Sequence, residues 1–448
     1  MREDARRMAV KSGMRPDEFQ AIVAAAQGGF RSRAGMLVAA AAGYRRPVRI
    51  LALDGGGTRA VLSLQVLKQV EELTGRSIRD SFDLIAGTST GGVLAVAIGL
   101  LGMSLKECEE LYLRCAREVF TMRGGPPGKT TSSGIYHAGK VLLLNRGIYD
   151  TRALNNIYQK ECGEGRFFEY AAGNGTPRVF VLSTQIRGSE GRVEMPRPYL
   201  HANYQLPLEK GRRARYAHGG VHRLSEGLRA TTAAPVYFDP FTDETGEVFC
   251  DGAVLVNNPT SVAIHEARCL WPGRPLGVVV SVGTGLFNQS GEEVALQKSE
   301  KSVKREVDAA EGAKPSRREE EKLGAGGEGE GKNRREWGGG LAFRVAQAVL
   351  ESATDTEGVH HTLEDLIERD DVYFRLNPEV EGDRILLDEY RPEVLNRLGT
   401  IGREYASGSG EGAKKIARLC HRLNALAKSG LHGYGLWRPM SSRSYARL

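Results

Sequence analysis

The sequence has no apolar stretch long enough to cross a lipid bilayer. Its longest, Gly91 to Leu101, is far shorter than the roughly 20 residues that a membrane-spanning helix needs. The first residues, MREDARRMAVKSGMRPDEF, lack the apolar core of a secretory signal and carry acidic side chains, which are scarce in transit peptides. We therefore expect a soluble, intracellular protein.

Closely spaced cysteine pairs are also missing. The six cysteines are scattered without a CxxC pair and stand at Cys108, Cys115, Cys162, Cys250, Cys269 and Cys420. Such spacing predicts free thiols in a reducing compartment and no zinc site.

Patterns typical of nucleic-acid binding are absent too, because the sequence contains no RRM, helix-turn-helix or zinc-finger signature. A net charge of +7 and a pI near 9.0 still favour anionic partners, either nucleic acid or an anionic membrane surface. A loosely basic surface without a specific partner explains the same charge equally well. We expect a membrane partner and no nucleic acid, and charge alone does not decide between them.

The 448 residues, 41% of them hydrophobic, are enough for one large domain or two ordinary ones. Changes in composition divide the chain into an N-terminal helical arm (1–45), the first part of a globular domain (46–290), a disordered charged insertion (291–340), a helical completion of that domain (341–430) and a tail (431–448). The insertion has mixed charge, many glycines and almost no large apolar residues. It therefore cannot bury enough surface to offset its ordering entropy.

Two strand–turn–helix units follow one another after residue 47. Val48 to Leu53 is a short apolar run, and a glycine turn and a helical pattern from Val61 to Leu73 come after it. Phe82 to Ala86 is a second strand candidate, followed by a tight turn and an apolar helix from Val93 to Leu100. Repeated strand–helix order predicts a three-layer α/β/α domain with a mainly parallel central sheet. Further buried strands are expected at 179–183 and 276–282.

A basic amphipathic helix is expected near the end of the chain, from Lys414 to Leu426. Ile416, Leu419, Leu423 and Leu426 lie on one face of it at helical spacing. Such a helix either rests on a membrane surface or packs on its own domain. The pattern leaves both open, although packing is the more frequent outcome.

Gly87-Thr88-Ser89-Thr90-Gly91 fits the nucleophile-elbow pattern, in which a serine occupies a sharp turn between a strand and a helix. Glycine suits Gly87 and Gly91 because a side chain there would collide with neighbouring backbone. With 56 glycines in the chain, one GxSxG match by chance has odds near even. The flanking strand and helix patterns favour the elbow, and the helix N-terminus adds a favourable dipole for an anion at the serine.

A glycine loop, Asp54-Gly55-Gly56-Gly57-Thr58-Arg59, follows the first expected strand. The three glycines leave backbone N–H groups unshielded and able to converge on an oxyanion, and the arginine adds positive charge. A plain tight turn is the alternative, and a second triple glycine at 338–340 shows that such runs also occur in a linker-like segment here. The position of the first run, between a strand and a helix, favours a functional loop.

The serine needs a base, and the residues alone leave a histidine or an aspartate possible. His222 and His265 come after the serine in ordered segments, but neither lies in a loop typical of catalysis. Asp251 follows a short apolar run, and Gly252 beside it permits close approach of backbone or ligand. Asp251 is the better candidate, although an ordinary Asp-Gly turn fits the same residues.

Taken in order along the chain, these three motifs resemble those of patatin-like phospholipases. They match the family's oxyanion loop, nucleophile elbow and dyad aspartate. Flanking stretches that are also similar are ATTAAP (230–235), NNP (257–259) and SVGTG (281–285). The stretches ECEELY (107–112), SATDTE (352–357) and YFRLNP (373–378) are similar to the calcium-independent phospholipase A2 gamma branch. The resemblance extends from Val48 to Leu426, apart from the charged insertion.

The resemblance implies a lipid acyl hydrolase with a Ser–Asp dyad. Ser89 would attack an ester carbonyl of a glycerophospholipid and form an acyl-enzyme, while Asp251 would accept the serine proton and later activate water. N–H groups of the loop, those of Gly56 and Gly57 above all, would hold the oxyanion, and Arg59 would steady the loop or meet lipid phosphate. The family implies no metal or cofactor, independence of calcium, and a cytoplasmic protein peripherally associated with intracellular membranes.

Three alternatives make different predictions. An actin-like sugar or acetate kinase also has glycines after a strand, but a second strand would follow them where Val61 to Leu73 has a helical pattern. A catalytically silent lipid-binding protein of the same fold would be expected to lack Ser89 or Asp251, and both are present. A Ser–His–Asp hydrolase would make His222 or His265 essential.

Overall fold

The computed structural model describes residues 47–120, 147–171, 175–189, 192–207, 214–287, 356–367, 369, 371–382 and 385–428. The expected N-terminal arm, the charged insertion, the segment 341–350 and the tail 431–448 lie outside these residues. The division of the chain inferred from composition therefore stays a prediction for those segments.

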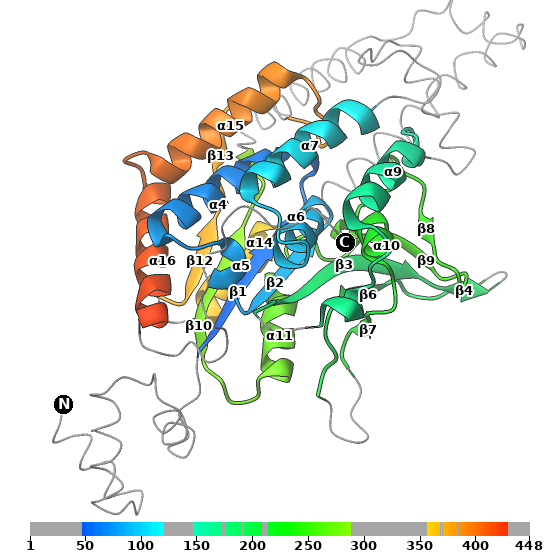
Figure 1. Cartoon of the computed structure of the whole chain (residues 1–448), viewed down its shortest axis with the longest axis horizontal. Helices are drawn as coiled ribbons and strands as arrows, with labels where there is room; N and C mark the ends of the chain where they lie inside the picture. Colours follow the sequence, from blue (N-terminus) through cyan, green and yellow to red (C-terminus); the bar gives the residue numbers. More distant parts are fainter. Residues whose placement is uncertain are drawn as a thin grey trace, which may run out of the picture.

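Among the described residues, a sheet of nine strands forms the centre of the domain (Figure 1). Its parallel part has the order β12-β10-β1-β2-β3. These strands are β1 (Val48–Leu53), β2 (Leu84–Thr88), β3 (Arg178–Ile186), β10 (Leu276–Val282) and β12 (Tyr373–Leu376). Beyond β3 the pairing is mostly antiparallel, through β6 (Arg197–Ala202), β7 (Ala217–Gly219), β8 (Phe241–Thr242) and β9 (Val248–Asp251).

Different helices cover the two faces of the sheet. Side chains alternate along each strand, so both faces carry apolar residues that are buried under helices. Leu51 and Leu53 of β1 belong to the core on one face, and Ile50 belongs to the core on the other. The first face carries α4 (Val61–Thr74), α6 (Thr90–Gly99), α7 (Leu105–Val119), α9 (Thr151–Cys162), α10 (Leu224–Thr231), α15 (Pro392–Ser407) and α16 (Glu411–Lys428). The second carries α11 (Thr260–Leu270) and α14 (Glu357–Leu366). The predicted three-layer α/β/α fold with a mainly parallel sheet is confirmed.

Short elements complete the described chain. They are α5 (Ile78–Ser81), the 3-10 turns η1 (Gly57–Ala60), η2 (Phe167–Tyr170) and η3 (Gly252–Val254), and the strand pairs β11 (Leu286–Phe287) with β13 (Glu379–Val380) and β4 (Gly188–Ser189) with β5 (Arg192–Val193). Residues 54–83, all of them described, contain no strand, and α4 follows the glycines almost at once. The second strand that an actin-like kinase would place there is absent, so that alternative is wrong.

Local sequence explains where the helices beside the sheet begin and end. At the start of α7, the hydroxyl of Ser104 accepts the N–H of Glu107 at 3.2 Å, and the Glu107 carboxylate accepts the N–H of Ser104 at 2.7 Å. α4 ends at Gly75, whose φ of 65° is the left-handed conformation that glycine adopts without strain. These signals set where α7 begins and where α4 ends.

The amphipathic helix α16 packs on the domain. Its residues Ile416, Leu419 and Leu423 are fully buried, and the helix contacts α4, α15, β10 and β12. Of the two possibilities open at the sequence level, packing is the one that the structure contains. The apolar face is used inside the protein, so membrane binding through this face is wrong.

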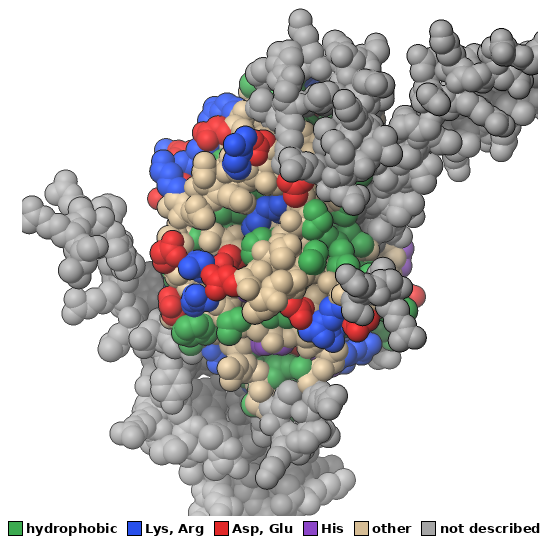
Figure 2. Space-filling model, turned by 90° about the vertical axis from the view of Figure 1, so that its right-hand side faces the viewer, with side chains coloured by type: hydrophobic (Ala, Val, Ile, Leu, Met, Phe, Trp, Pro, Cys, Tyr) green, Lys and Arg blue, Asp and Glu red, His purple; other side chains and the backbone are tan. Residues whose placement is uncertain are grey.

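Surface charge is mixed on the face of the molecule shown in Figure 2, where Lys and Arg side chains lie among Asp and Glu side chains. The net charge of +7 therefore does not produce a uniformly basic surface on that face. Among the described helices, none combines the length and the hydropathy that spanning a bilayer requires.

Candidate active site

Ser89 occupies a strained turn at the carboxyl end of β2. Its φ of 52° and ψ of −126° form a conformation that L-residues rarely adopt. The turn lies directly between β2 and α6, the context in which a GxSxG motif forms an elbow. A Cβ on Gly87 would lie 2.2 Å from the carbonyl oxygen of Gly91, and one on Gly91 would lie 2.3 Å from that of Leu53. The close packing of this turn therefore requires both glycines.

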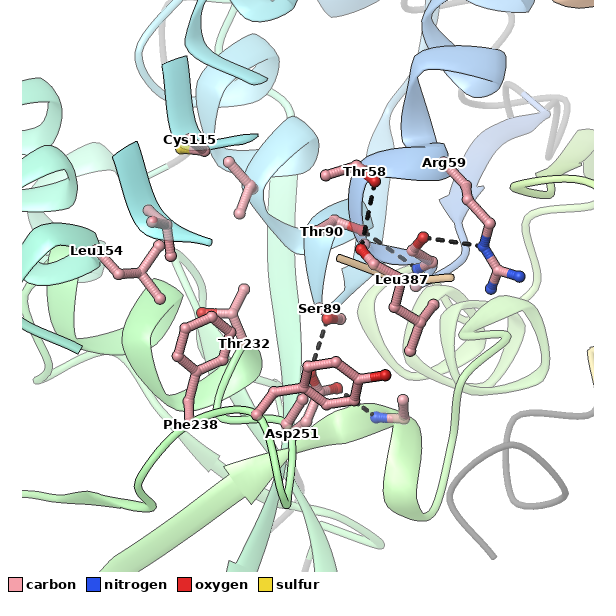
Figure 3. Close-up of a pocket in the computed structure, with 18 of the residues that line it drawn as sticks. Thr58, Arg59, Ser89, Thr90, Cys115, Leu154, Thr232, Phe238, Asp251 and Leu387 are labelled. Carbon is pink, nitrogen blue, oxygen red and sulfur yellow. Dashed lines mark hydrogen bonds between the residues drawn. The ribbon is translucent and has the colours of Figure 1, made fainter. Parts of the chain in front are cut away.

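The Ser89 hydroxyl donates a hydrogen bond of 2.7 Å to Oδ2 of Asp251 (Figure 3). Asp251 is the last residue of β9 and is 2% exposed. Its second oxygen, Oδ1, accepts the N–H of Ala253 at 2.8 Å, and its backbone carbonyl accepts the Thr184 hydroxyl at 3.0 Å. These bonds orient the carboxylate and leave one oxygen directed at the serine.

Burial makes Asp251 an unusually basic carboxylate. Loss of solvent raises its pKa to about 7, against the opposing hydrogen bonds from Ser89 and Ala253. An ordinary aspartate, whose pKa is about 3.9, is a much weaker base. A carboxylate with a pKa near neutrality is ionised above pH 7 and still accepts a proton readily.

The glycine loop after β1 lies against the serine. A Cβ on Gly55 would be 3.0 Å from the Cβ of Ser89, so the loop backbone reaches the nucleophile. The Gly55 N–H donates to the Asn257 carbonyl at 3.3 Å, and the Gly56 N–H donates to the Thr90 hydroxyl at 3.2 Å. Both N–H groups therefore have an acceptor within the protein in this structure.

Gly57 and Arg59 determine how the loop is held. Gly57 has a φ of 59°, and a Cβ there would lie 2.0 Å from the carbonyl oxygen of Leu387. Arg59 donates from Nε to the Gly56 carbonyl at 3.1 Å, and its guanidinium lies 5.0 Å from the ring centroid of Phe287. Of the two expectations for Arg59, the contact with its own loop is therefore present in the structure.

Ser89 lines a cavity whose walls are mostly apolar (Figure 3). Its polar side is formed by Ser89, Asp251, the three loop glycines and Arg59. The apolar walls come from α6, α7, α9 and the segments that follow α7 and α10, and include Val93, Val119, Phe120, Leu154, Tyr237 and Phe238. The structure thus brings the predicted nucleophile, base and loop to one cavity, while Gly87 and Gly91 shape the turn that carries the serine.

Residues 51–264, which include the elbow, the glycine loop and Asp251, match the family model of patatin-like phospholipases. Residues 51–264 therefore form a patatin-like phospholipase domain. The resemblance drawn from the three motifs is thereby confirmed, and so is its similarity to the calcium-independent phospholipase A2 gamma branch.

Three relatives show how far this patatin-like similarity extends. Calcium-independent phospholipase A2-gamma of Rattus norvegicus is 31% identical over 90% of this chain and 43% of its own length. The protein of that name from Homo sapiens is 32% identical over 84% of this chain and 40% of its own length. Phospholipase A I of Arabidopsis thaliana is 27% identical over 85% of this chain and 28% of its own length. The chain spans less than half the length of these curated relatives.

Some groups that support the patatin-like site were not predicted from the sequence. The Thr231 hydroxyl accepts the N–H of Ser89 at 2.9 Å, and the Tyr112 hydroxyl donates to the carbonyl of Thr90. The Leu387 carbonyl accepts the N–H of Thr58 at 2.9 Å. Thr231 lies in the ATTAAP stretch, which pointed to the family without indicating this role, and Leu387 lies in no motif at all.

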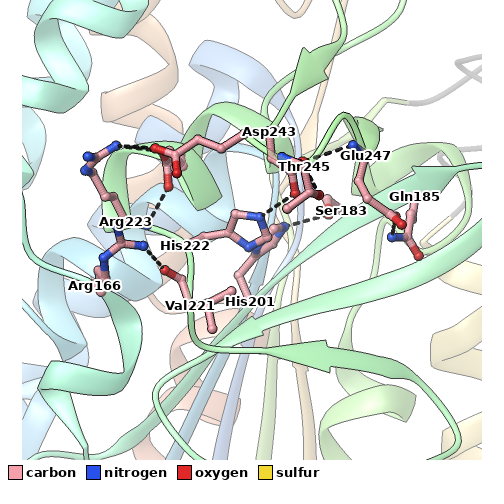
Figure 4. Close-up of polar contacts among 12 residues, drawn as sticks. Arg166, Ser183, Gln185, His201, Val221, His222, Arg223, Asp243, Thr245 and Glu247 are labelled. Carbon is pink, nitrogen blue, oxygen red and sulfur yellow. Dashed lines mark hydrogen bonds and ion pairs between the residues drawn. The ribbon is translucent and has the colours of Figure 1, made fainter.

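The described histidines are not at the cavity, since none of the residues that line it is a histidine. His265 lies on α11, where its Nε2 is 3.6 Å from the sulfur of Cys269. His222 is part of a buried chain of hydrogen bonds elsewhere in the domain (Figure 4). A triad that joins Ser89 to either histidine has no support in the described residues.

The buried chain containing His222 links four side chains. Nε2 of His222 is 3.1 Å from Asp243, and its Nδ1 is 3.1 Å from Nδ1 of His201. Nε2 of His201 is 2.8 Å from the hydroxyl of Ser183. Burial lowers the pKa of His201 well below its usual value, so this ring is neutral at pH 7.

Among the described residues, one group has ligand atoms close enough to share a metal ion: His360, His361 and Glu364 of α14. None of the three lines the Ser89 cavity, whose acidic residue is Asp251. Calcium takes about 6–8 oxygen ligands, and carboxylates are prominent among them. The side chains around Ser89 therefore do not have the composition of a calcium site.

Proposed function

We propose that this patatin-like chain hydrolyses fatty-acyl esters of glycerophospholipids through a Ser89–Asp251 dyad, by way of an acyl-enzyme and without calcium. The 2.7 Å hydrogen bond between these two side chains, at the wall of an apolar cavity, is the observation that supports it most directly. Relatives that match most of this chain are phospholipases by name.

In the acylation step, Oγ of Ser89 attacks the ester carbonyl carbon while its proton passes to Oδ2 of Asp251. The carbonyl oxygen gains negative charge in the tetrahedral intermediate. Collapse of the intermediate breaks the bond to the lipid alcohol, and the proton on Asp251 passes to the departing oxygen. The products are a lysolipid and an acyl ester on Ser89.

Deacylation repeats these steps with water. Asp251 accepts a proton from water as the water oxygen attacks the acyl carbon, and a second tetrahedral intermediate forms. Its collapse releases the fatty acid and returns the proton to Oγ of Ser89. One carboxylate is sufficient for both steps because it is alternately ionised and protonated.

The oxyanion needs donors that are in place before charge develops. We assign this role to the N–H groups of Gly56 and Gly57, because the glycine loop lies against Ser89. Helix α6 begins at Thr90, so its N-terminus adds partial positive charge at the same point. Arg59 stabilises the loop through the Gly56 carbonyl.

The apolar walls of the cavity suit a fatty-acyl chain. Each buried methylene contributes about 0.8 kcal/mol of binding free energy, so an acyl chain gains most of its affinity from such walls. The substrate resides in a bilayer, and we therefore propose that the protein associates peripherally with intracellular membranes from the cytoplasm.

The test is release of free fatty acid from mixed phospholipid vesicles in the presence of a calcium chelator, with wild type compared with Ser89→Ala. Release by wild type and none by the variant is the expected result. A serine-directed fluorophosphonate should also label wild type and fail to label Ser89→Ala. No release and no labelling of wild type would favour a silent lipid-binding protein, and loss of activity with chelator would contradict calcium independence.

A further inference from the structure

Two buried ion pairs lie at opposite ends of β1. At its amino end Arg49 pairs with Asp83 at 3.0 Å, and the two side chains are 6% and 9% exposed. At its carboxyl end Asp54 pairs with Arg375 at 2.7 Å, and the aspartate and arginine side chains are 1% and 3% exposed. The second pair includes the first residue of the glycine loop, because Asp54 is followed directly by Gly55.

Arg375, on β12, is fixed by neighbours other than Asp54. Its Nη1 donates to the hydroxyl of Ser281 on β10 at 2.8 Å. Its Nη2 donates to Oε1 of Glu357 at 2.6 Å and to Oγ1 of Thr356 at 3.0 Å, both at the start of α14. These partners hold the guanidinium with Nη1 2.7 Å from Oδ2 of Asp54, an ion pair in which no N–H of Arg375 is aligned as a hydrogen bond to the carboxylate.

Asp54 connects this arrangement to the active-site loop. Its N–H donates to the Val282 carbonyl at 3.0 Å and its carboxylate pairs with Arg375, so both backbone and side chain are held. The Gly55 carbonyl accepts the Thr284 hydroxyl at 3.2 Å. Rotation of the backbone at Asp54 would move Gly55 and the N–H groups that follow it. The orientation of those groups therefore depends on the ion pair.

The partners of Asp54 come from a part of the chain that the family model does not reach. The match to the family ends at residue 264, whereas β12 and the start of α14 come later in the chain. Glu357 and Arg375 lie in the stretches SATDTE and YFRLNP, whose similarity to the gamma branch does not indicate a contact with Asp54. The contacts that stabilise the loop are nevertheless made from that later segment.

We propose that Arg375 is a positioning residue for acyl transfer, in that its ion pair with Asp54 sets the orientation of the glycine loop beside Ser89. The proposal rests on the proposed function, because the loop has an oxyanion to bind only if Ser89 attacks an ester. Arg375 touches no reacting atom and acts through Asp54 alone.

The depth of Asp54 explains why a positive charge is needed there. Burial raises the pKa of Asp54 to about 7, and the charge of Arg375 acts against that rise. Without the guanidinium the pKa of Asp54 would rise further and the carboxyl would lose its ion pair with β12. The first residue of the loop would then be held by its backbone hydrogen bonds alone.

The experiment compares Arg375→Met, Arg375→Lys and Asp54→Asn with Arg49→Met in the full chain. Arg49→Met is the matched control, because it also removes a buried arginine from an ion pair on β1, roughly 16 Å of strand away from the loop. Hydrolysis of a soluble fatty-acyl ester gives kcat and KM. Thermal unfolding and the rate of fluorophosphonate labelling are measured on the same samples.

We expect Arg375→Met to lower kcat and the labelling rate about 100-fold with KM changed little, as a misplacement of about 1 Å at a reacting centre does. Arg375→Lys should recover part of the loss, since it restores the charge without the second donor. Arg49→Met should lower thermal stability by a similar amount and leave kcat within about threefold of wild type. The pH midpoint of activity should be the same in Arg49→Met as in wild type, because Asp251 and Asp54 both keep their partners there.

The proposal is overturned if Arg375→Met and Arg49→Met have the same kcat, since the arginine would then contribute stability alone. An unchanged plateau of kcat in Arg375→Met, whatever its pH midpoint, would overturn it as well, because the loop would then be oriented without the ion pair. If Arg375→Met does not fold, Asp54→Asn decides: normal kcat and labelling in a folded Asp54→Asn contradict the proposal. Absence of activity and labelling in wild type would instead reject the proposed function.

Discussion

Two serines of this domain each bond to a side chain that can take a proton, and their surroundings differ completely. Ser89 bonds to Asp251 from a turn with a φ of 52°, at the wall of a cavity. Ser183 bonds to His201 from within β3, and both of these side chains are fully buried. The second cluster has the residue types of a Ser–His–Asp triad, yet its serine has no exposed surface from which to attack a substrate. Backbone geometry and access, more than the bonding partner, separate a nucleophile from a structural serine.

The buried histidine chain has a defined donor at its Asp243 end. Burial acts to raise the pKa of Asp243, but hydrogen bonds from Thr245 and His222 hold it below its usual value, so Asp243 is ionised. Nε2 of His222 must then be the donor to Asp243. The neutral ring of His201 joins Nδ1 of His222 to the hydroxyl of Ser183, with one ring nitrogen donating and the other accepting. Each polar group in the chain therefore has a hydrogen-bond partner, as buried polar groups generally do.

The largest effect is expected at the dyad itself. Ser89→Ala and Asp251→Asn should each lower kcat for fatty-acid release by about 10⁴-fold or more, since one removes the nucleophile and the other cannot accept its proton. Ser183→Ala, measured beside them, should leave kcat within about threefold of wild type. Substantial turnover by either dyad variant would remove the contrast between the two serines.

A second test concerns the glycine loop. Gly56→Ala should lower kcat about 100-fold, as loss of one oxyanion donor does, because the new Cβ would lie 2.0 Å from Oγ1 of Thr284 and displace the loop. Gly410→Ala is the control, since a Cβ there meets nothing within 4 Å. Equal kcat values for the two variants would mean that the loop does not bind the oxyanion.

The pH dependence of kcat should follow Asp251. The protonated carboxyl cannot accept the serine proton, so activity should fall about tenfold per pH unit below the midpoint and reach a plateau above it. The midpoint is expected near the Asp251 pKa of about 7. Profiles measured between pH 5 and about pH 9 on a soluble ester would show this, and a midpoint near about 4, the ordinary aspartate value, would argue against a buried base.

The smallest effect on rate is expected from the histidine chain. His222→Ala should keep kcat within about threefold of wild type, because no histidine lines the cavity. It should lower the free energy of unfolding by about 2 kcal/mol, since His201 and Asp243 lose a buried partner. Urea unfolding and fatty-acid release on the same sample test both statements. A large loss of rate with unchanged stability would mean that the histidine chain contributes to catalysis at Ser89.

The parts of the site that follow from local geometry could be predicted from the sequence. A sharp turn between a strand and a helix demands glycines at fixed positions, so Gly87 and Gly91 indicated the elbow, and the alternation of strands and helices indicated the fold. Asp251 was less certain, because it is 162 residues away from Ser89 and only folding brings the two together. Their meeting in the structure agrees with the prediction, and their catalytic roles stay predictions.

The rest depends on contacts between distant segments. The stretch YFRLNP (373–378), which contains Arg375, indicates the family but not the contact with Asp54, and Leu387 contributes only a backbone carbonyl, which every residue has. The apolar stripe of α16 has the same spacing whether its partner is a membrane or α4. Only the packed structure distinguishes between those partners.

The strand order has a consequence for how the chain is made. β1 pairs with β2 on one side and with β10 on the other. β10 lies far later in the sequence, so Val48 cannot pair with Leu276 until that part of the chain has been synthesised. A nascent chain therefore emerges with one edge of its central strand open until the ribosome has passed Val282. An open apolar edge is a site for pairing with other chains. A fragment that stops at residue 264, where the family match ends, would keep that edge open permanently and is expected to aggregate.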